Sequence, residues 1–152
     1  MYPQFILIFA IILAVIIAVP IFSGGLGKKS KSKKSQFAGA TTIDKKFVQE
    51  KWQEIESIIS SGGASQLKVG IMEADKLVDY VLKCRGISGN NMGERMKSAK
   101  TKFSDYSDYN NLWFAHKVRN NVAHESSHEL GSAEAKRAVE YFKKALKILG
   151  AL

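Results

Sequence analysis

The sequence predicts an all-α protein, a helical bundle of four to five helices preceded by a single transmembrane helix. Two observations support this fold class. From residue 42 onward, apolar residues return at every third or fourth position, which is the spacing of helices that bury one face. An uninterrupted run of 18 apolar residues, 5–22, precedes that part of the chain. No segment shows the alternating pattern that is typical of a strand, and there is no internal repeat.

The apolar run is long enough to cross a bilayer. At about 1.5 Å per residue, a helix of this length measures about 27 Å, which is close to the thickness of the hydrocarbon core. A cleavable signal peptide is the alternative, but no Lys or Arg precedes the run and no clean small-x-small cleavage site follows it. We therefore expect residues 1–23 to be a transmembrane anchor, with residues 4–22 in contact with the membrane.

The flanks of the run predict its orientation. Residues 24–41 are rich in Gly, Ser and Lys and indicate a flexible linker, whose five lysines follow the run directly, whereas no charged side chain precedes it. The positive-inside rule then predicts a single-pass protein of the cell membrane with its C-terminal domain in the cytoplasm. Such a polybasic flank also favours anionic headgroups, by about 1 kcal/mol per lysine. The single cysteine, Cys84, cannot form an internal disulfide, as suits a reducing compartment.

Residues 42–152 form the predicted domain, and its first three amphipathic segments follow one another closely. A helix from Thr42, its expected N-cap, runs to about residue 60 and ends before Gly62. A second helix spans about residues 65–83 and ends before Gly86. A third and weaker one covers about residues 91–103, where Gly93 lowers the helix propensity. Their expected buried faces are Val48, Trp52, Ile55 and Ile59; Leu67, Ile71, Ala74, Val78 and Val81; and Met92, Met96, Ala99 and Phe103.

Two further helices complete the predicted bundle. Residues 104–109 form a short connection rich in capping residues, and a central helix follows to about residue 125. The last helix begins at Ser132, the expected N-cap, and runs to about residue 149. Their expected buried faces are Leu112, Ala115, Val118 and Val122, and then Ala135, Ala138, Phe142, Ala145 and Leu149.

The central helix carries the strongest candidate site, made of Arg119, Asn120 and His124. Asn120 and His124 are four residues apart and share a helix face, and Arg119 is close enough to reach the same point. A guanidinium offers a planar fork of donors that fits phosphate oxygens, and an imidazole can move a proton near neutral pH. His116 lies two turns before His124 on roughly the same side, either as a supporting residue or, more commonly at such a position, as an ordinary surface residue.

Basic side chains crowd the third helix and continue onto the fourth. Such a run is usually only a solvated helix face, but it can also form the basic rim of a phosphate-binding groove. With the five linker lysines set aside, the net charge falls from +9 to +4, which permits RNA binding without requiring it. The candidate RNA-binding residues are Arg95, Lys97, Lys100, Lys102 and Lys117.

A zinc-protease pattern overlaps this site, because residues 124–128 read His-Glu-Ser-Ser-His. Two histidines four residues apart can share zinc, with Glu125 as general base. However, the usual position of the third ligand is Glu134, no strands are predicted to hold a substrate, and no methionine follows Met96 to form a methionine turn. A zinc metalloprotease through His124 and His128 is therefore the remote alternative, and we expect neither a metal site nor a cofactor.

The run of residues 119–125, Arg-Asn-Asn-Val-Ala-His-Glu, resembles the HEPN superfamily (higher eukaryotes and prokaryotes nucleotide-binding domain). The shared features are an Arg and a His separated by four residues, a polar residue directly after the Arg, and a place in the penultimate helix of a small all-helical domain. The resemblance extends over about residues 44–149 and implies a metal-independent endoribonuclease of the toxin, defence or RNA-processing type. A non-catalytic helical module that binds RNA, nucleotides or proteins is the alternative.

The resemblance also implies residue roles and an assembly. His124 would be the general base or acid at the ribose 2′-hydroxyl, Arg119 would bind the scissile phosphate, and Asn120 would orient the pair. HEPN-like nucleases commonly form two-fold dimers, which suits this chemistry because in-line transfer uses both a base and an acid. We therefore expect a homodimer with a composite site. Aromatic residues that could line its interface or stack on bases are Tyr106, Tyr109, Trp113 and Phe114.

Overall fold

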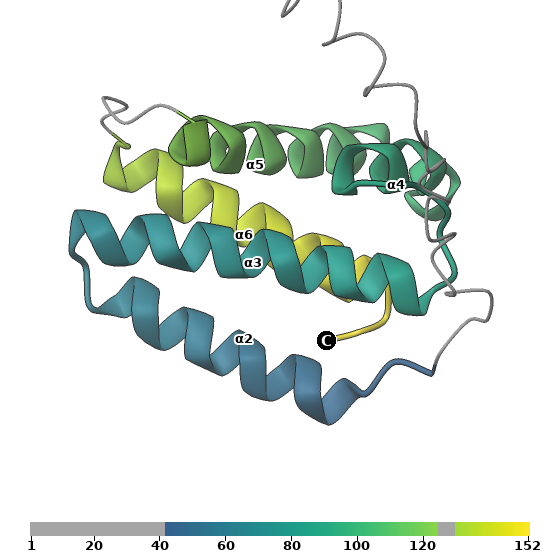
Figure 1. The fold of residues 1–152 in the computed structure, drawn as a ribbon, viewed down its shortest axis with the longest axis horizontal. Helices are drawn as coiled ribbons and strands as arrows, with labels where there is room; N and C mark the ends of the chain where they lie inside the picture. Colours follow the sequence, from purple (N-terminus) through teal and green to yellow (C-terminus); the bar gives the residue numbers. More distant parts are fainter. Residues whose placement is uncertain (1–41, 125–129) are drawn as a thin grey trace, which may run out of the picture. The chain divides into compact units, whose positions relative to one another are not determined.

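The computed structural model describes residues 42–124 and 130–152, and in these two ranges it is all-helical, without strands (Figure 1). The predicted helical bundle is thus confirmed. The five α-helices and one short 3-10 helix are α2 (Lys45–Ser60), α3 (Ala64–Cys84), α4 (Met92–Ser98), η1 (Lys100–Lys102), α5 (Tyr106–His124) and α6 (Ser132–Ile148).

The predicted membrane anchor, the linker and its five lysines all lie outside the described residues. Among the helices that the structure does describe, none has the length and apolar character needed to cross a membrane. The anchor, its orientation and the cellular location therefore stay predictions from the sequence.

Helix α3 is the centre of the bundle. It packs against α2 on one side and against α5 and α6 on the other, and α4 also contacts it (Figure 1). Consecutive helices α5 and α6 pack along each other, as expected for two helices joined by a short connection. Because α3 contacts every other α-helix of the described part, a side chain on α3 can meet residues from α4 and α5 at one point.

The core agrees with the predicted helix faces. Every residue expected to be buried is buried except Ile59 and Val122, which are half-buried. Each large apolar side chain removed from water contributes about 1.5–3 kcal/mol, so these residues supply the main driving force for folding. The largest fully buried side chains come from five helices: Phe142, Ile71, Leu82, Met96, Leu112, Leu146, Val48, Val78 and Val81.

Helix ends differ from the prediction by a few residues. Asp44, not Thr42, caps α2, and its side chain accepts a hydrogen bond of 3.0 Å from the Phe47 amide. A carboxylate at this position also interacts favourably with the positive end of the helix dipole. Helix α5 begins at Tyr106, inside the predicted connection, and α6 is preceded by Gly131 as N-cap, so Ser132 is its first helical residue. The left-handed φ of 80° at Gly62 confirms the predicted stop of α2.

Candidate functional site

A hollow between α3, α4 and α5 contains two of the three predicted catalytic residues, Arg119 and Asn120. Its volume is about 440 Å³. His116 joins them because residues three and four positions apart lie on one helix face. The lining residues are Asp75, Lys76 and Asp79 from α3, Asn91 before α4, Met92 and Gly93 from α4, and His116, Arg119 and Asn120 from α5.

Asp75 is the buried centre of this site. Its side chain is 5% exposed; Oδ1 lies 2.7 Å from His116 Nδ1, and Oδ2 lies 3.4 Å from Arg119 Nε. A buried carboxylate is costly unless it is paired and hydrogen bonded, and here two groups from α5 meet that need. The pairing therefore fixes the position of α5 against α3 at the level of the hollow.

Arg119 is held at one end and open at the other. Its Nη1 donates a 3.0 Å hydrogen bond to the Asn120 side-chain oxygen, and Nε is buried but finds no hydrogen-bond partner within the described ranges. A quarter of the side chain is exposed, and it borders the hollow. A guanidinium has five N–H donors, and among the described residues only one of them, on Nη1, makes a hydrogen bond, so the remaining donors on Nη1 and Nη2 can bind a ligand oxygen.

His116 is not the ordinary surface residue that the sequence favours. It is buried, with its ring against the edge of Trp113 at a centroid distance of 6.1 Å and its Nδ1 on the Asp75 carboxylate. The surface prediction was wrong because the partner of His116 lies 41 positions earlier in the chain, on another helix. A signal was nevertheless present in the sequence, since Asp75 stands next to Ala74 on the apolar face of α3, where a carboxylate needs a partner.

His124 lies apart from this cluster. It is exposed, is the last residue of α5 and does not line the hollow. Eight residues separate it from His116, which at about 1.5 Å per residue places it about 12 Å further along the helix. The structure therefore brings Arg119 and Asn120 together with His116, but it does not bring His124 into the same hollow.

The predicted RNA-binding residues fall into two groups. Lys97, Lys100, Lys102 and Lys117 are exposed, and the Lys100 ammonium lies 5.4 Å from the centre of the Tyr106 ring. Arg95 is instead buried, with its Nε and Nη2 donating to the two Asp79 oxygens at 2.6 and 3.1 Å and its Nη1 to the Gly89 carbonyl. Arg95 therefore has a structural role and is removed from the basic rim.

The predicted aromatic residues all lie in α5, and most of them pack against other side chains of the protein. Tyr109 is buried beside Phe103, and Phe114 packs edge-on against Tyr141. Tyr106 is the exception, with 62% of its surface exposed. Of the four residues considered for stacking or dimerisation, Tyr106 is thus the one presented most openly to a partner.

The zinc-protease pattern lies mostly outside the described residues, which end at His124 and resume at Leu130. Over the ranges 42–124 and 130–152, no group of three His, Cys, Asp or Glu side chains is arranged to hold a metal ion. The prediction that His124 and His128 bind no zinc is therefore still to be tested.

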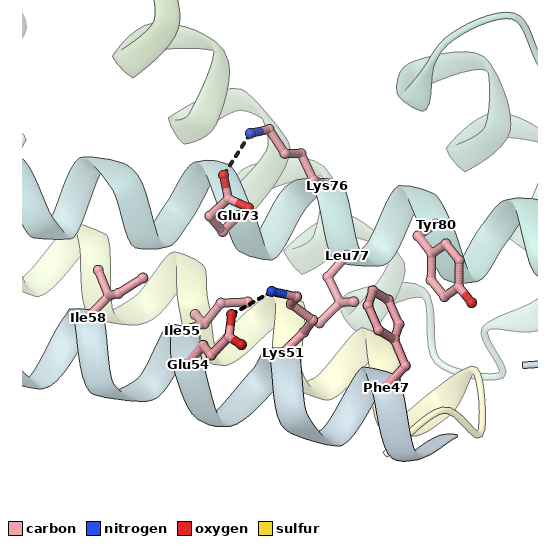
Figure 2. Close-up of a pocket in the computed structure, with 9 residues that line it drawn as sticks. All are labelled: Phe47, Lys51, Glu54, Ile55, Ile58, Glu73, Lys76, Leu77 and Tyr80. Atoms are coloured by element: carbon pink, nitrogen blue, oxygen red, sulfur yellow. Dashed lines mark hydrogen bonds and ion pairs between the residues drawn. The ribbon is translucent and has the colours of Figure 1, made fainter. Parts of the chain in front are cut away.

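A second hollow lies between α2 and α3 and has a different character (Figure 2). Its volume is about 200 Å³, and its wall is apolar, with the Phe47 and Tyr80 rings edge-to-face at 5.2 Å. Ion pairs of 2.6 Å, Lys51 with Glu54 and Lys76 with Glu73, lie along its edge (Figure 2). Its charged groups are paired with each other and do not converge on a common point, so it lacks the arrangement of a catalytic site.

Comparison of the chain with models of protein families, with curated proteins and with solved structures gave no match in any of the three.

Proposed function

We propose that the domain is a membrane-anchored, HEPN-like, metal-independent endoribonuclease, whose phosphate-binding residue is Arg119. The observation that supports this best is the open end of Arg119 in a hollow next to a buried histidine–aspartate pair. A guanidinium with unused donors suits the oxygens of a phosphodiester. The RNA supplies its own 2′-hydroxyl nucleophile, so neither a metal ion nor an activated water is needed.

The roles of the three motif residues follow from this proposal. Arg119 binds the scissile phosphate and stabilises the charge that develops on it. Asn120 orients Arg119, in line with the 3.0 Å hydrogen bond between their side chains. His124 exchanges a proton with the ribose or with the leaving oxygen. In a homodimer, His124 of a second copy can also approach the phosphate, since its side chain is exposed.

The exposed lysines would guide the RNA toward the hollow. Lys97, Lys100 and Lys102 stand on one segment, and Tyr106 next to Lys100 offers an open ring for base stacking. Such aromatic and basic neighbours are typical of single-strand binding without strong sequence preference. Binding through this surface should weaken as salt rises, because phosphate contacts release counterions.

The test is incubation of the purified full-length chain, in detergent, with single-stranded RNA in EDTA. Cleavage with products that end in a 2′,3′-cyclic phosphate is expected. Arg119→Ala should lower the rate about 100-fold or more, and His124→Ala should also lower it strongly. Asn110→Ala, an exposed change on the same helix, is the matched control. Absence of EDTA-resistant cleavage by the wild-type dimer across varied RNAs would refute the nuclease.

A non-catalytic binding module is the second candidate function. The observation in its favour is the Asp75 carboxylate, which lies 3.4 Å from Arg119 Nε and partly neutralises the guanidinium. This candidate predicts salt-sensitive RNA binding without cleavage. Filter binding at two salt concentrations tests the binding, which both candidates predict, and the cleavage assay in EDTA on the same proteins separates the two candidates.

A further inference from the structure

In the buried pair of Asp75 and His116, only one of the two ring nitrogens, Nδ1, contacts the carboxylate. An ionised carboxylate only accepts hydrogen bonds, so the 2.7 Å contact places the imidazole proton on Nδ1. The lone pair of the neutral ring is then on Nε2. A carboxylate behind an imidazole in this way fixes the tautomer and the orientation of the ring.

The Nε2 side of the ring faces a space that a glycine keeps open. A Cβ atom placed on Gly93 would lie 4.0 Å from His116 Nε2, 3.7 Å from the Trp113 ring and 3.4 Å from the Asn91 side-chain oxygen. Gly93 stands in the first turn of α4, where its backbone has no positive φ that would require glycine. The missing side chain therefore leaves access to His116 at some cost in helix propensity.

His116 and Arg119 border the same hollow. They are three residues apart on α5, which is about 4.5 Å along the helix axis, and they share one helix face. Asp75 contacts both, so their relative position is fixed by a single carboxylate. A phosphodiester bound by the open end of Arg119 would place its neighbouring ribose within reach of this part of the hollow.

We propose that His116 is a catalytic general base for the RNA cleavage proposed above, and that Asp75 is its positioning residue. This inference rests on the proposed nuclease function and deepens it. It gives the Arg119 hollow its own proton acceptor, and it leaves His124 of a second chain to act as the acid, since His124 of the same chain does not line this hollow.

The proton balance of the step is complete. His116 Nε2 takes the proton of the ribose 2′-hydroxyl while O2′ forms its bond to phosphorus. The bond from phosphorus to the 5′-oxygen breaks, and that oxygen takes a proton from protonated His124. The products are a 2′,3′-cyclic phosphate and a 5′-hydroxyl end, with His116 protonated and His124 neutral. Proton exchange with water restores both residues, so no oxidant, metal or other reactant is needed.

The decisive variant is His116→Asn, whose amide can still donate to Asp75 but has no atom in the place of Nε2. The full-length chain is assayed in EDTA under single-turnover conditions. We expect the rate constant to fall about 10²- to 10⁴-fold, as for loss of a general base, while RNA affinity and the melting temperature stay close to those of the wild type. His128→Asn is the matched control and should cleave like the wild type.

Asp75→Asn tests the positioning role through the tautomer of His116. Because the carboxylate accepts the Nδ1 proton of His116, its replacement should lower the single-turnover rate constant and should no longer fix the proton on Nδ1 in a long-range proton–nitrogen spectrum. The charged groups that border the hollow with His116 are Asp75, Lys76 and Asp79 on α3 and Arg119 on α5, whereas Met92 and Gly93 of α4, and Asn91 before it, are uncharged. A purely structural Asp75 would leave the tautomer of His116 unchanged.

A measurement that leaves both His116 and Asp75 unchanged makes the test independent of folding defects caused by their replacement. The chain has three histidines, so a His124→Asn, His128→Asn double variant leaves His116 as the only imidazole. A long-range proton–nitrogen spectrum of the neutral ring should show the proton on Nδ1 and none on Nε2. Protonation on Nε2 would overturn the inference, and so would His116→Asn cleaving within threefold of a wild type that is active. A wild type that cleaves no RNA would instead overturn the proposed function, and this inference with it.

Discussion

Replacing Arg95 with Met should destabilise the domain strongly, although the sequence places Arg95 among exposed basic residues. The variant keeps most of the length of the side chain but removes the guanidinium. Two hydrogen bonds to Asp79, of 2.6 and 3.1 Å, and one to the Gly89 carbonyl are lost with it. The Asp79 side chain is only 16% exposed, so little water can replace the guanidinium as a partner of its carboxylate.

The expected loss of stability depends on the partners that Asp79 keeps after the guanidinium of Arg95 is removed. Removing one member of a buried ion pair costs about 3–5 kcal/mol. Asp79 keeps the Lys83 ammonium at 2.7 Å, a partly exposed partner, which offsets some of that loss. We therefore expect the free energy of unfolding to fall by about 3 kcal/mol and the melting temperature by roughly 12–24 °C. Lys97→Met, an exposed change on the same helix, should stay within about 0.5 kcal/mol of the wild type.

The loss in the free energy of unfolding caused by Arg95→Met should also depend on pH in a defined direction. Burial raises the pKa of Asp79, but the hydrogen bonds from Arg95 and Lys83, together with their charges, outweigh burial and hold it below its ordinary value of 3.8. A carboxylate with a lowered pKa stabilises the folded state above the ordinary value, and this contribution disappears as the pH falls through the folded pKa. The gap between wild type and Arg95→Met should therefore be full at pH 7 and shrink below pH 3.8. Urea unfolding of the wild type and of Arg95→Met, at pH 7 and at pH 3, measures this difference in the free energy of unfolding. A loss under 1 kcal/mol at pH 7, or a gap that widens in acid, would refute this reasoning.

Four further predictions are independent of catalysis. Residues 42–152 alone should give a strongly helical circular dichroism spectrum and one cooperative melt; a substantial strand content would revive the protease. In oriented vesicles the domain should be protected from outside protease, and its digestion in intact spheroplasts would exclude the cytoplasmic orientation. Protein purified without added metal should hold no stoichiometric zinc by elemental analysis; zinc that disappears on His128→Ala would contradict this. Gly93→Ala should raise the free energy of unfolding by up to about 1 kcal/mol, because the added methyl finds contacts of 3.4–4.0 Å and no clash; a lower melting temperature would show that the site cannot accept it.

The helices could be predicted from the sequence because each buried face is a local pattern. Val48, Trp52 and Ile55 recur at three- and four-residue steps, and this spacing alone indicates which side of α2 is covered. The ends were harder, since both Thr42 and Asp44 are good capping residues and only the fold decides between them. The start of α5 at Tyr106 was missed for the same reason, because Ser104 and Asp105 indicate a turn as readily as a helix start.

The candidate site was predictable only along one helix. Arg119 and Asn120 stood out through their spacing on α5, but the partners of a side chain on another helix leave no periodic signal. His116 and Asp75 are 41 residues apart, and Arg95 and Asp79 are 16 apart. From the sequence alone, His116 and Arg95 are therefore expected at the surface, where unpaired polar residues usually lie. A charged residue beside a strongly apolar helix face was the available clue, and it applied to Asp75.

Asp75 and Asp79 together explain how the hollow keeps its shape. They are four residues apart and therefore share one face of α3. Asp79 binds Arg95 of α4, whereas Asp75 binds His116 and lies next to Arg119 of α5. The wall that contains Gly93 and the wall that contains His116 are thus each attached to α3 by a carboxylate, one turn apart. The Arg95 pair, although it contacts no proposed substrate group, positions α4 opposite His116 Nε2. Arg95→Met should consequently lose RNA cleavage at a lower temperature than the wild type, in parallel with its melt, whereas His116→Asn should lose cleavage at every temperature.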